Sequence, residues 1–132
     1  MSDIAYIDAS AFVKLFALEP ESKAVAAAID EEWRNIVASE ILAVEAFRAA
    51  LRIGDGAPAA ASRFLRRVVL LPLSSEVRER SCRIGTPELR TLDAIHLATA
   101  LSQDAQAGAI FTYDARLAQA STDAGLRVLA PA

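Results

Sequence analysis

Four acidic residues occupy strand ends or apolar helical segments, where a carboxylate is expected to bind a ligand or to pair with another group. They are Asp8, Glu45, Asp93 and Asp114. Asp8 and Asp114 each follow a short apolar run that predicts a strand, and ligands of open α/β sheets bind beyond the carboxyl ends of strands. Glu45 and Asp93 lie in helical segments that are otherwise apolar, where an unpartnered charge is unfavourable. Carboxylates that meet at one place repel unless a cation neutralises them, and their hard oxygens suit Mg²⁺ or Mn²⁺.

Each acid also has an ordinary structural interpretation. Asp8 and Asp114 could be helix N-caps, Glu45 could face solvent, and Asp93 could lie in a favourable first helical turn. His96 comes three residues after Asp93 and shares its helix face. It could bind metal or act as a general base, but we favour a packed or hydrogen-bonded core residue.

The surrounding elements alternate between strand and helix. Short apolar runs predict strands at 4–7, 35–38, 68–73, 109–112 and 127–129. Helical patterns fill the gaps, at 9–18, 20–33, 39–53, 58–67, 75–84, 90–102 and 114–124. We expect Ser39 to cap the third helix and 68–73 to be a buried strand. The alternation predicts right-handed βαβ units and a sheet covered on both faces. The expected fold is α/β: one three-layer α/β/α domain over residues 1–132, with a mostly parallel sheet of four to five short strands.

Length and composition agree with a single domain. The chain has 132 residues, 54% of them hydrophobic, which is enough for one core. Its one cysteine, Cys82, cannot form an internal disulfide, which suits a reducing cytoplasm. We expect it to be a small apolar filler. The N-terminal segment lacks a basic region and does not resemble a signal peptide. The apolar stretches are too short to span a membrane.

The charge pattern leaves nucleic-acid binding open. A net charge of −3 argues mildly against it, because phosphate contacts need basic residues. However, nine arginines and only four acids lie between Arg48 and Arg90. Guanidinium groups suit phosphate well, although solvated helix faces would explain them equally.

The acids recur in ordered motifs that extend along the chain. These are Tyr6–Ala11 with Val13–Leu15, Ser39–Glu45, Leu92–Ala100, Phe111–Leu117, and Gly125–Leu129 followed by Pro131. Together they resemble PIN domains, and VapC toxins of VapBC toxin–antitoxin pairs in particular. Each motif alone is weak, but four acidic motifs in this order and spacing are specific to the family.

This resemblance implies a PIN-like fold and a Mg²⁺- or Mn²⁺-dependent endoribonuclease, a hydrolase of RNA phosphodiester bonds. It places Asp8, Glu45, Asp93 and Asp114 at the metal, directly or through water, as the catalytic set. Ser10 and Thr112 would orient a carboxylate or water. Arg48 and Arg52 would meet RNA phosphates; Arg116 would do so or pair with an acid. The resemblance also implies a cytoplasmic homodimer, without a membrane, that is neutralised by a VapB-like antitoxin.

Other functions are weighed against this one. A haloacid-dehalogenase-type phosphatase needs an aspartate where Ser10 stands, and a response-regulator receiver needs a late lysine, whereas none follows Lys23. A PIN-like scaffold that binds RNA or protein without cleaving it stays open, as does a housekeeping PIN nuclease. The RNA target, the number of ions and the division of ligands also stay open.

Overall fold

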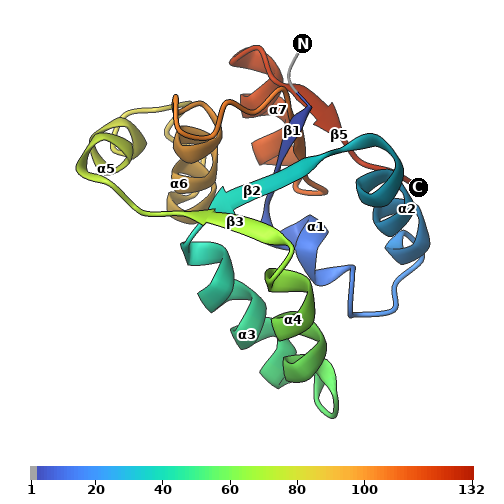
Figure 1. Ribbon diagram of the computed structural model, residues 1–132. Coiled ribbons are helices and arrows are strands. Elements are labelled where there is room, and N and C mark those ends of the chain that lie inside the picture. Colours follow the sequence, from blue (N-terminus) through green and yellow to red (C-terminus); the bar gives the residue numbers. More distant parts are fainter. Residues whose placement is uncertain (1–2) are drawn as a thin grey trace.

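Five parallel strands form the centre of the molecule. The computed structural model describes residues 3–132, and its strands are β1 (Ile4–Ile7), β2 (Asn35–Ser39), β3 (Val68–Leu71), β4 (Ala109–Phe111) and β5 (Arg127–Leu129). Their order in the sheet is β3-β2-β1-β4-β5 (Figure 1). The central strand β1 pairs with β2 on one side and β4 on the other, with Ala5 opposite both Ile36 and Ala109. The strand order therefore reverses between β1 and β4, where open sheets bind ligands.

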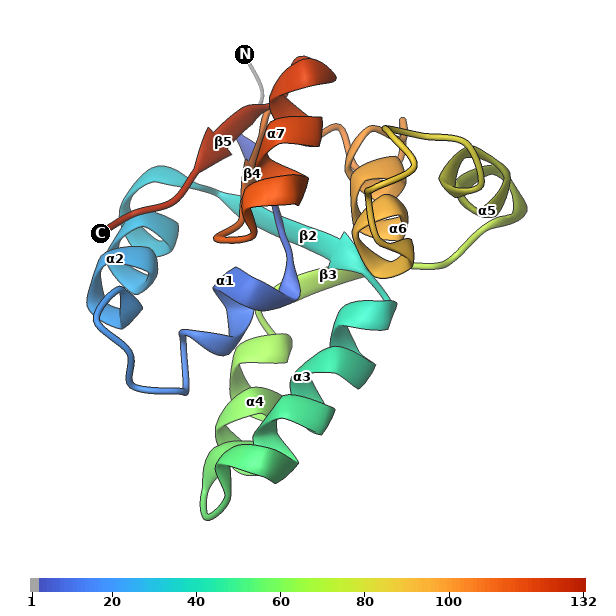
Figure 2. The same ribbon diagram turned by 180° about the vertical axis from the view of Figure 1, so that it is seen from behind.

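Helices cover both faces of this sheet. They are α1 (Ala9–Val13), α2 (Ser22–Glu32), α3 (Ile41–Ile53), α4 (Ala57–Leu65), α5 (Ser75–Ser81), α6 (Thr91–Ala100) and α7 (Ala115–Asp123). Helix α2 lies on one side of the sheet, whereas α6 and α7 pack on the other, with α5 outside α6 (Figures 1 and 2). Helix α3 packs against α4 and α1 below the sheet edge. The expected three-layer α/β/α fold with a parallel sheet is confirmed.

The inner strands supply the core because both of their faces are covered. Tyr6, Ile7, Ile110 and Phe111 are fully buried, which is typical of apolar strands in parallel sheets. Successive side chains of a strand point to opposite faces: Tyr6 contacts His96 of α6, whereas Ile7 borders a small cavity with Ile29 of α2. Burial of each large apolar side chain stabilises the fold by roughly 1.5–3 kcal/mol.

The edge strand differs from the prediction. The segment 68–73 was expected to be a buried strand, but β3 lies at one edge of the sheet and pairs only with β2 among residues 3–132. Val69 and Leu70 are 52% and 38% exposed, so the prediction of burial was wrong. The strand also ends at Leu71, immediately before Pro72, which lacks the N–H that a ladder requires.

Two helix boundaries also depart from expectation. Helix α1 ends at Val13 instead of continuing to Leu18. The amides of Leu15 and Phe16 bond to carbonyls three residues earlier, and Leu18 itself adopts a left-handed conformation with φ 45°, which opposes a right-handed helix. Ser39 ends β2 and is not the N-cap of α3; Glu40 occupies the N-cap position. The Ser39 hydroxyl still accepts a hydrogen bond from the Ile41 amide at 3.2 Å.

Cys82 is exposed, so its predicted role as an apolar filler was wrong. No helix within residues 3–132 has the length and apolarity needed to cross a bilayer. The N-terminal segment that we examined for a signal peptide begins with residues 1 and 2, which lie outside the described part of the chain. The single domain over 1–132 accordingly stays a prediction at that end.

Candidate active site

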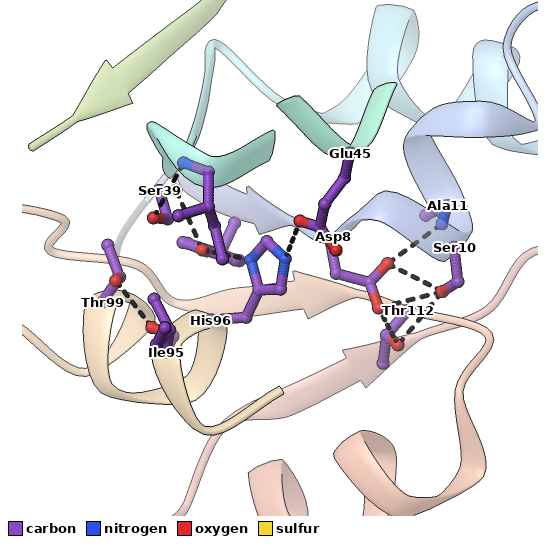
Figure 3. A network of polar contacts seen from close by, with 11 residues as sticks. Asp8, Ser10, Ala11, Ser39, Glu45, Ile95, His96, Thr99 and Thr112 are labelled. Atoms are coloured by element: carbon purple, nitrogen blue, oxygen red, sulfur yellow. Dashed lines mark hydrogen bonds and ion pairs between the residues drawn. The ribbon is translucent and has the colours of Figure 1, made fainter. Parts of the chain in front are cut away.

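Asp8 lies at the carboxyl end of β1, and its side chain is held by hydrogen bonds from three directions (Figure 3). The Ala11 amide donates to Oδ1 at 3.0 Å, which makes Asp8 the N-cap of α1. The Thr112 hydroxyl donates to Oδ2 at 2.6 Å, and the Ser10 hydroxyl lies within 2.9 Å of both oxygens. Asp8 is only 2% exposed. Burial raises the pKa of its carboxyl group, and the hydrogen bonds from Thr112 and Ala11 oppose that rise.

The two hydroxyls also join the ends of β1 and β4. The Tyr113 amide donates to Ser10 Oγ at 2.9 Å, and the Asp114 amide donates to Thr112 Oγ1 at 3.1 Å. Because both hydroxyls accept from one strand end and donate to Asp8, the carboxylate has one well-defined orientation. This is the position from which we expected Ser10 and Thr112 to orient an acid; their part in metal binding stays a prediction.

Asp114 is the N-cap of α7. Its Oδ1 accepts from the amides of Arg116 and Leu117, at 2.9 and 3.0 Å. The capping interpretation thus holds for both Asp8 and Asp114. Capping is compatible with a ligand site at the same residues. The N-caps of helices that follow parallel strands lie at the carboxyl edge of the sheet, which is where ligands bind.

Asp93 occupies the first turn of α6 and is half-buried. Its pKa is raised from 3.8 to about 6, first by burial and then by the negative charges of Asp114, Asp8 and Glu45, while His96 acts in the opposite direction. Four carboxylates from four separate segments therefore act on one another electrostatically. This mutual repulsion is the feature that a bound cation would relieve.

Glu45 points inward from α3 and contacts His96. Its Oε1 lies 2.7 Å from His96 Nε2, and its side chain is 19% exposed, so the solvent-facing interpretation was wrong. His96 is buried, with Nδ1 2.6 Å from the Tyr6 hydroxyl. The prediction of a hydrogen-bonded core histidine is confirmed. Our sequence reasoning missed Tyr6, although a tyrosine within a buried strand signals a hydroxyl that needs a partner.

A cleft of about 800 Å³ opens between α1 and α3, and Glu45 is the one of the four acids that borders it. Ser10 and Glu45 border it, together with Arg48 and Arg52 from the following turns of α3. Arg48 and Arg52 thus share the cleft with Glu45, from which they are three and seven residues away along α3. Their contact with RNA stays a prediction. Arg116 is placed differently: it is exposed and lines another hollow, with Glu88 and Asp123.

Lys14, which lines the cleft, is a second residue that we missed. Its ammonium group contacts Glu19 and Glu21 at 2.5 and 2.8 Å and lies 4.7 Å from the centre of the Tyr113 ring. The hydrogen bonds that Lys14 donates to Glu19 and Glu21 raise the pKa of Lys14, so the group stays charged at neutral pH. Lys14 belongs to the first motif, in the segment Val13–Leu15, and this position could have indicated a role at the site.

The donor chemistry fits a hard divalent cation. All four acids offer oxygen atoms, and their repulsion favours added positive charge. Within residues 3–132, no group of three acidic, histidine or cysteine side chains has the geometry to hold one ion. Mg²⁺ does not need such a cage, because it retains several waters and is often bound through one or two carboxylates.

Comparison with known proteins identifies the class. The model of the PIN domain family matches residues 5–122, so the chain belongs to the PIN domain family. It is 39% identical over 126 residues to ribonuclease VapC46 of Mycobacterium tuberculosis (strain ATCC 25618 / H37Rv), and 37% identical over 130 residues to ribonuclease VapC35 of the same strain. Each alignment covers 96% of both chains. Within the PIN family the chain is thus a ribonuclease of the VapC toxin group, as expected from its motifs.

Solved structures share the fold. The sarcin–ricin-loop-cleaving toxin VapC20 of Mycobacterium tuberculosis superposes with a TM-score of 0.73 at 16% identity, covering 92% of this chain and 95% of the other. A toxin–antitoxin complex from Klebsiella pneumoniae contains a chain with a TM-score of 0.69 at 23% identity, covering 97% and 98%. At these identities the likeness shows the architecture alone.

Proposed function

We propose that this VapC-type ribonuclease is the toxin of a VapBC-like pair and hydrolyses RNA with Mg²⁺ or Mn²⁺ at Asp8, Glu45, Asp93 and Asp114. The observation that carries the proposal is the gathering of the four acids beyond the carboxyl ends of β1 and β4, where Asp8 and Asp114 cap α1 and α7. Burial and the charges of the other three acids raise the pKa of Asp93 there. A cluster of this kind is unfavourable in the free protein, and a divalent cation converts it into a binding site.

The position of each residue indicates its role in this proposal. Asp93, Asp114 and Glu45 would hold the ion, directly or through water, and Asp8 would complete the set in the orientation that Ser10 and Thr112 impose. When bound, the ion supplies Lewis acidity toward a phosphate oxygen and lowers the pKa of a bound water. Arg48 and Arg52 border the cleft, where their guanidinium groups would bind the RNA backbone on either side of the cut.

The same cleft suits an inhibitory partner. Val44, Leu92 and Arg52 line it, so it offers both apolar contact and positive charge to a peptide. We expect the tail of a VapB-like antitoxin to occupy it and thereby exclude RNA. A homodimer and a cytoplasmic location, where the RNA targets are, complete the proposal.

A catalytically silent PIN-like scaffold is the second candidate. Retention of four repelling acids favours the nuclease, because a scaffold gains nothing from them. The two candidates differ in their response to metal.

Purified protein should be incubated with tRNA, rRNA and mRNA in Mg²⁺ or Mn²⁺, and again with excess EDTA. We expect cleavage that EDTA stops and that Asp93→Asn abolishes. Cleavage that persists in excess chelator would reject the metal mechanism. Binding of RNA without cleavage of any of the three would favour the scaffold.

A further inference from the structure

A buried chain of hydrogen bonds connects the backbone of β2 to Glu45. The Ser39 amide donates to the Tyr6 hydroxyl oxygen at 2.9 Å, that oxygen lies 2.6 Å from His96 Nδ1, and His96 Nε2 lies 2.7 Å from Glu45 Oε1. The side chains come from β1, α6 and α3, and Tyr6 and His96 are at most 1% exposed. Figure 3 shows the imidazole of His96 between Ser39 and Glu45.

With a neutral imidazole, the distances along this series of hydrogen bonds fit one arrangement of protons. A carboxylate only accepts hydrogen bonds, so His96 Nε2 must carry the hydrogen that Glu45 receives. In a neutral imidazole, Nδ1 is then an acceptor. The oxygen of Tyr6 already accepts from Ser39, and its own hydrogen is free to point to Nδ1. In this arrangement, each donor in the series from Ser39 to Glu45 faces an acceptor.

Packing holds the imidazole ring in place as well. The Tyr6 and His96 rings meet edge to face, with centroids 5.6 Å apart and planes at 75°. A glutamate that becomes fixed on a ligand loses rotamer freedom, and this loss of conformational entropy opposes binding. A fixed N–H donor reduces the number of conformations that Glu45 samples before any ligand arrives.

We propose that Tyr6 and His96 are positioning residues that hold the Glu45 carboxylate toward Asp8 and Asp93. The inference rests on the proposed metal-dependent function and adds two residues to it, neither of which touches the ion. Hydrogen-bond partners behind a metal ligand typically change metal affinity or activity by about 10- to 100-fold when they are removed. The alternative is that the chain merely satisfies polar groups in the core.

The test measures Mn²⁺ binding to the full, metal-free chain by calorimetry. His96→Leu should weaken Mn²⁺ binding by about 10-fold or more, and His96→Gln, which retains an N–H donor at about the reach of Nε2, should restore part of it. Tyr6→Phe keeps the ring and should weaken binding less than His96→Leu. Leu97→Val is the matched control: it removes a buried methylene from the neighbouring position of α6 and should leave Mn²⁺ affinity unchanged.

The single histidine of the chain gives a second measurement. An ¹⁵N spectrum of the untagged protein reports on one imidazole ring, and we expect the hydrogen on Nε2 in the wild type and a shift of the Nδ1 signal in Tyr6→Phe. A hydrogen on Nδ1 alone would overturn the inference. Folded His96→Leu and Tyr6→Phe proteins that bind Mn²⁺ as the wild type does would also overturn it, while leaving the proposed function intact. A wild type that does not bind Mn²⁺ would instead reject the proposed function, and this inference with it.

Discussion

Replacement of Asp93 by asparagine should separate stability from activity. The variant keeps the size of the side chain but removes the charge that burial and three neighbouring acids oppose. We expect cleavage to be lost, because the neutral amide is a poor substitute for a carboxylate at a divalent cation. We expect the metal-free fold, by contrast, to become more stable at neutral pH.

The size of this gain follows from the pKa of Asp93. The folded-state pKa of about 6 exceeds the ordinary value of 3.8, and two pKa units correspond to roughly 3 kcal/mol. Because Asp93 is only half-buried, solvent screening reduces the expected gain to about 1–2 kcal/mol. The folded state binds the proton more tightly, so this stability is present in the wild type below about pH 4 and is lost as pH rises through 6.

Urea unfolding of both proteins in EDTA, at about pH 4 and about pH 8, measures the difference. Asp93→Asn should exceed the wild type by about 1–2 kcal/mol at the higher pH and match it at the lower. Asp55→Asn is the control for net charge, since Asp55 is exposed in the turn between α3 and α4. A loss of several kcal/mol in Asp93→Asn with undiminished cleavage would show that Asp93 is structural and refute the reasoning.

Three further predictions concern the same site. Mn²⁺ affinity, measured by calorimetry, should fall as pH drops below about 6, because Asp93 must lose its proton to bind metal; a flat profile would remove Asp93 from the site. Thr112→Val deletes the 2.6 Å hydrogen bond to the buried carboxylate beside it, and should lower the free energy of unfolding by about 1–3 kcal/mol at neutral pH. Since that hydrogen bond stabilises the charged form of Asp8, the loss of unfolding free energy should be smaller in acid than at neutral pH. An equal loss in acid and at neutral pH would contradict this. Replacement of Arg48 and Arg52 by alanine should weaken RNA binding and make its salt dependence shallower by about one unit of slope per lost contact. An unchanged slope would place the RNA elsewhere, whereas Arg127→Ala, at the amino end of the edge strand β5, should leave binding unaffected.

Local features of this protein were predictable because their determinants lie close together in the chain. Asp8 and Asp114 cap helices whose amides are two or three residues away, so composition and position alone indicate them. Alternation of apolar runs and helical patterns likewise predicts the parallel sheet. The order of the acidic motifs was enough to predict the family that the comparisons confirm.

Burial and partnership were decided by the tertiary structure. The apolar runs of β1 and β3 look alike in sequence, yet only the strand order makes β3 an exposed edge. Glu45 and His96 are 51 positions apart, and His96 and Tyr6 are 90 apart. Periodicity gives the face of a helix on which a residue lies, but the hydrogen-bond partner on another element depends on how the helices pack. That packing also places Arg48 and Arg52 in the same cleft as Glu45 and Arg116 in a different hollow.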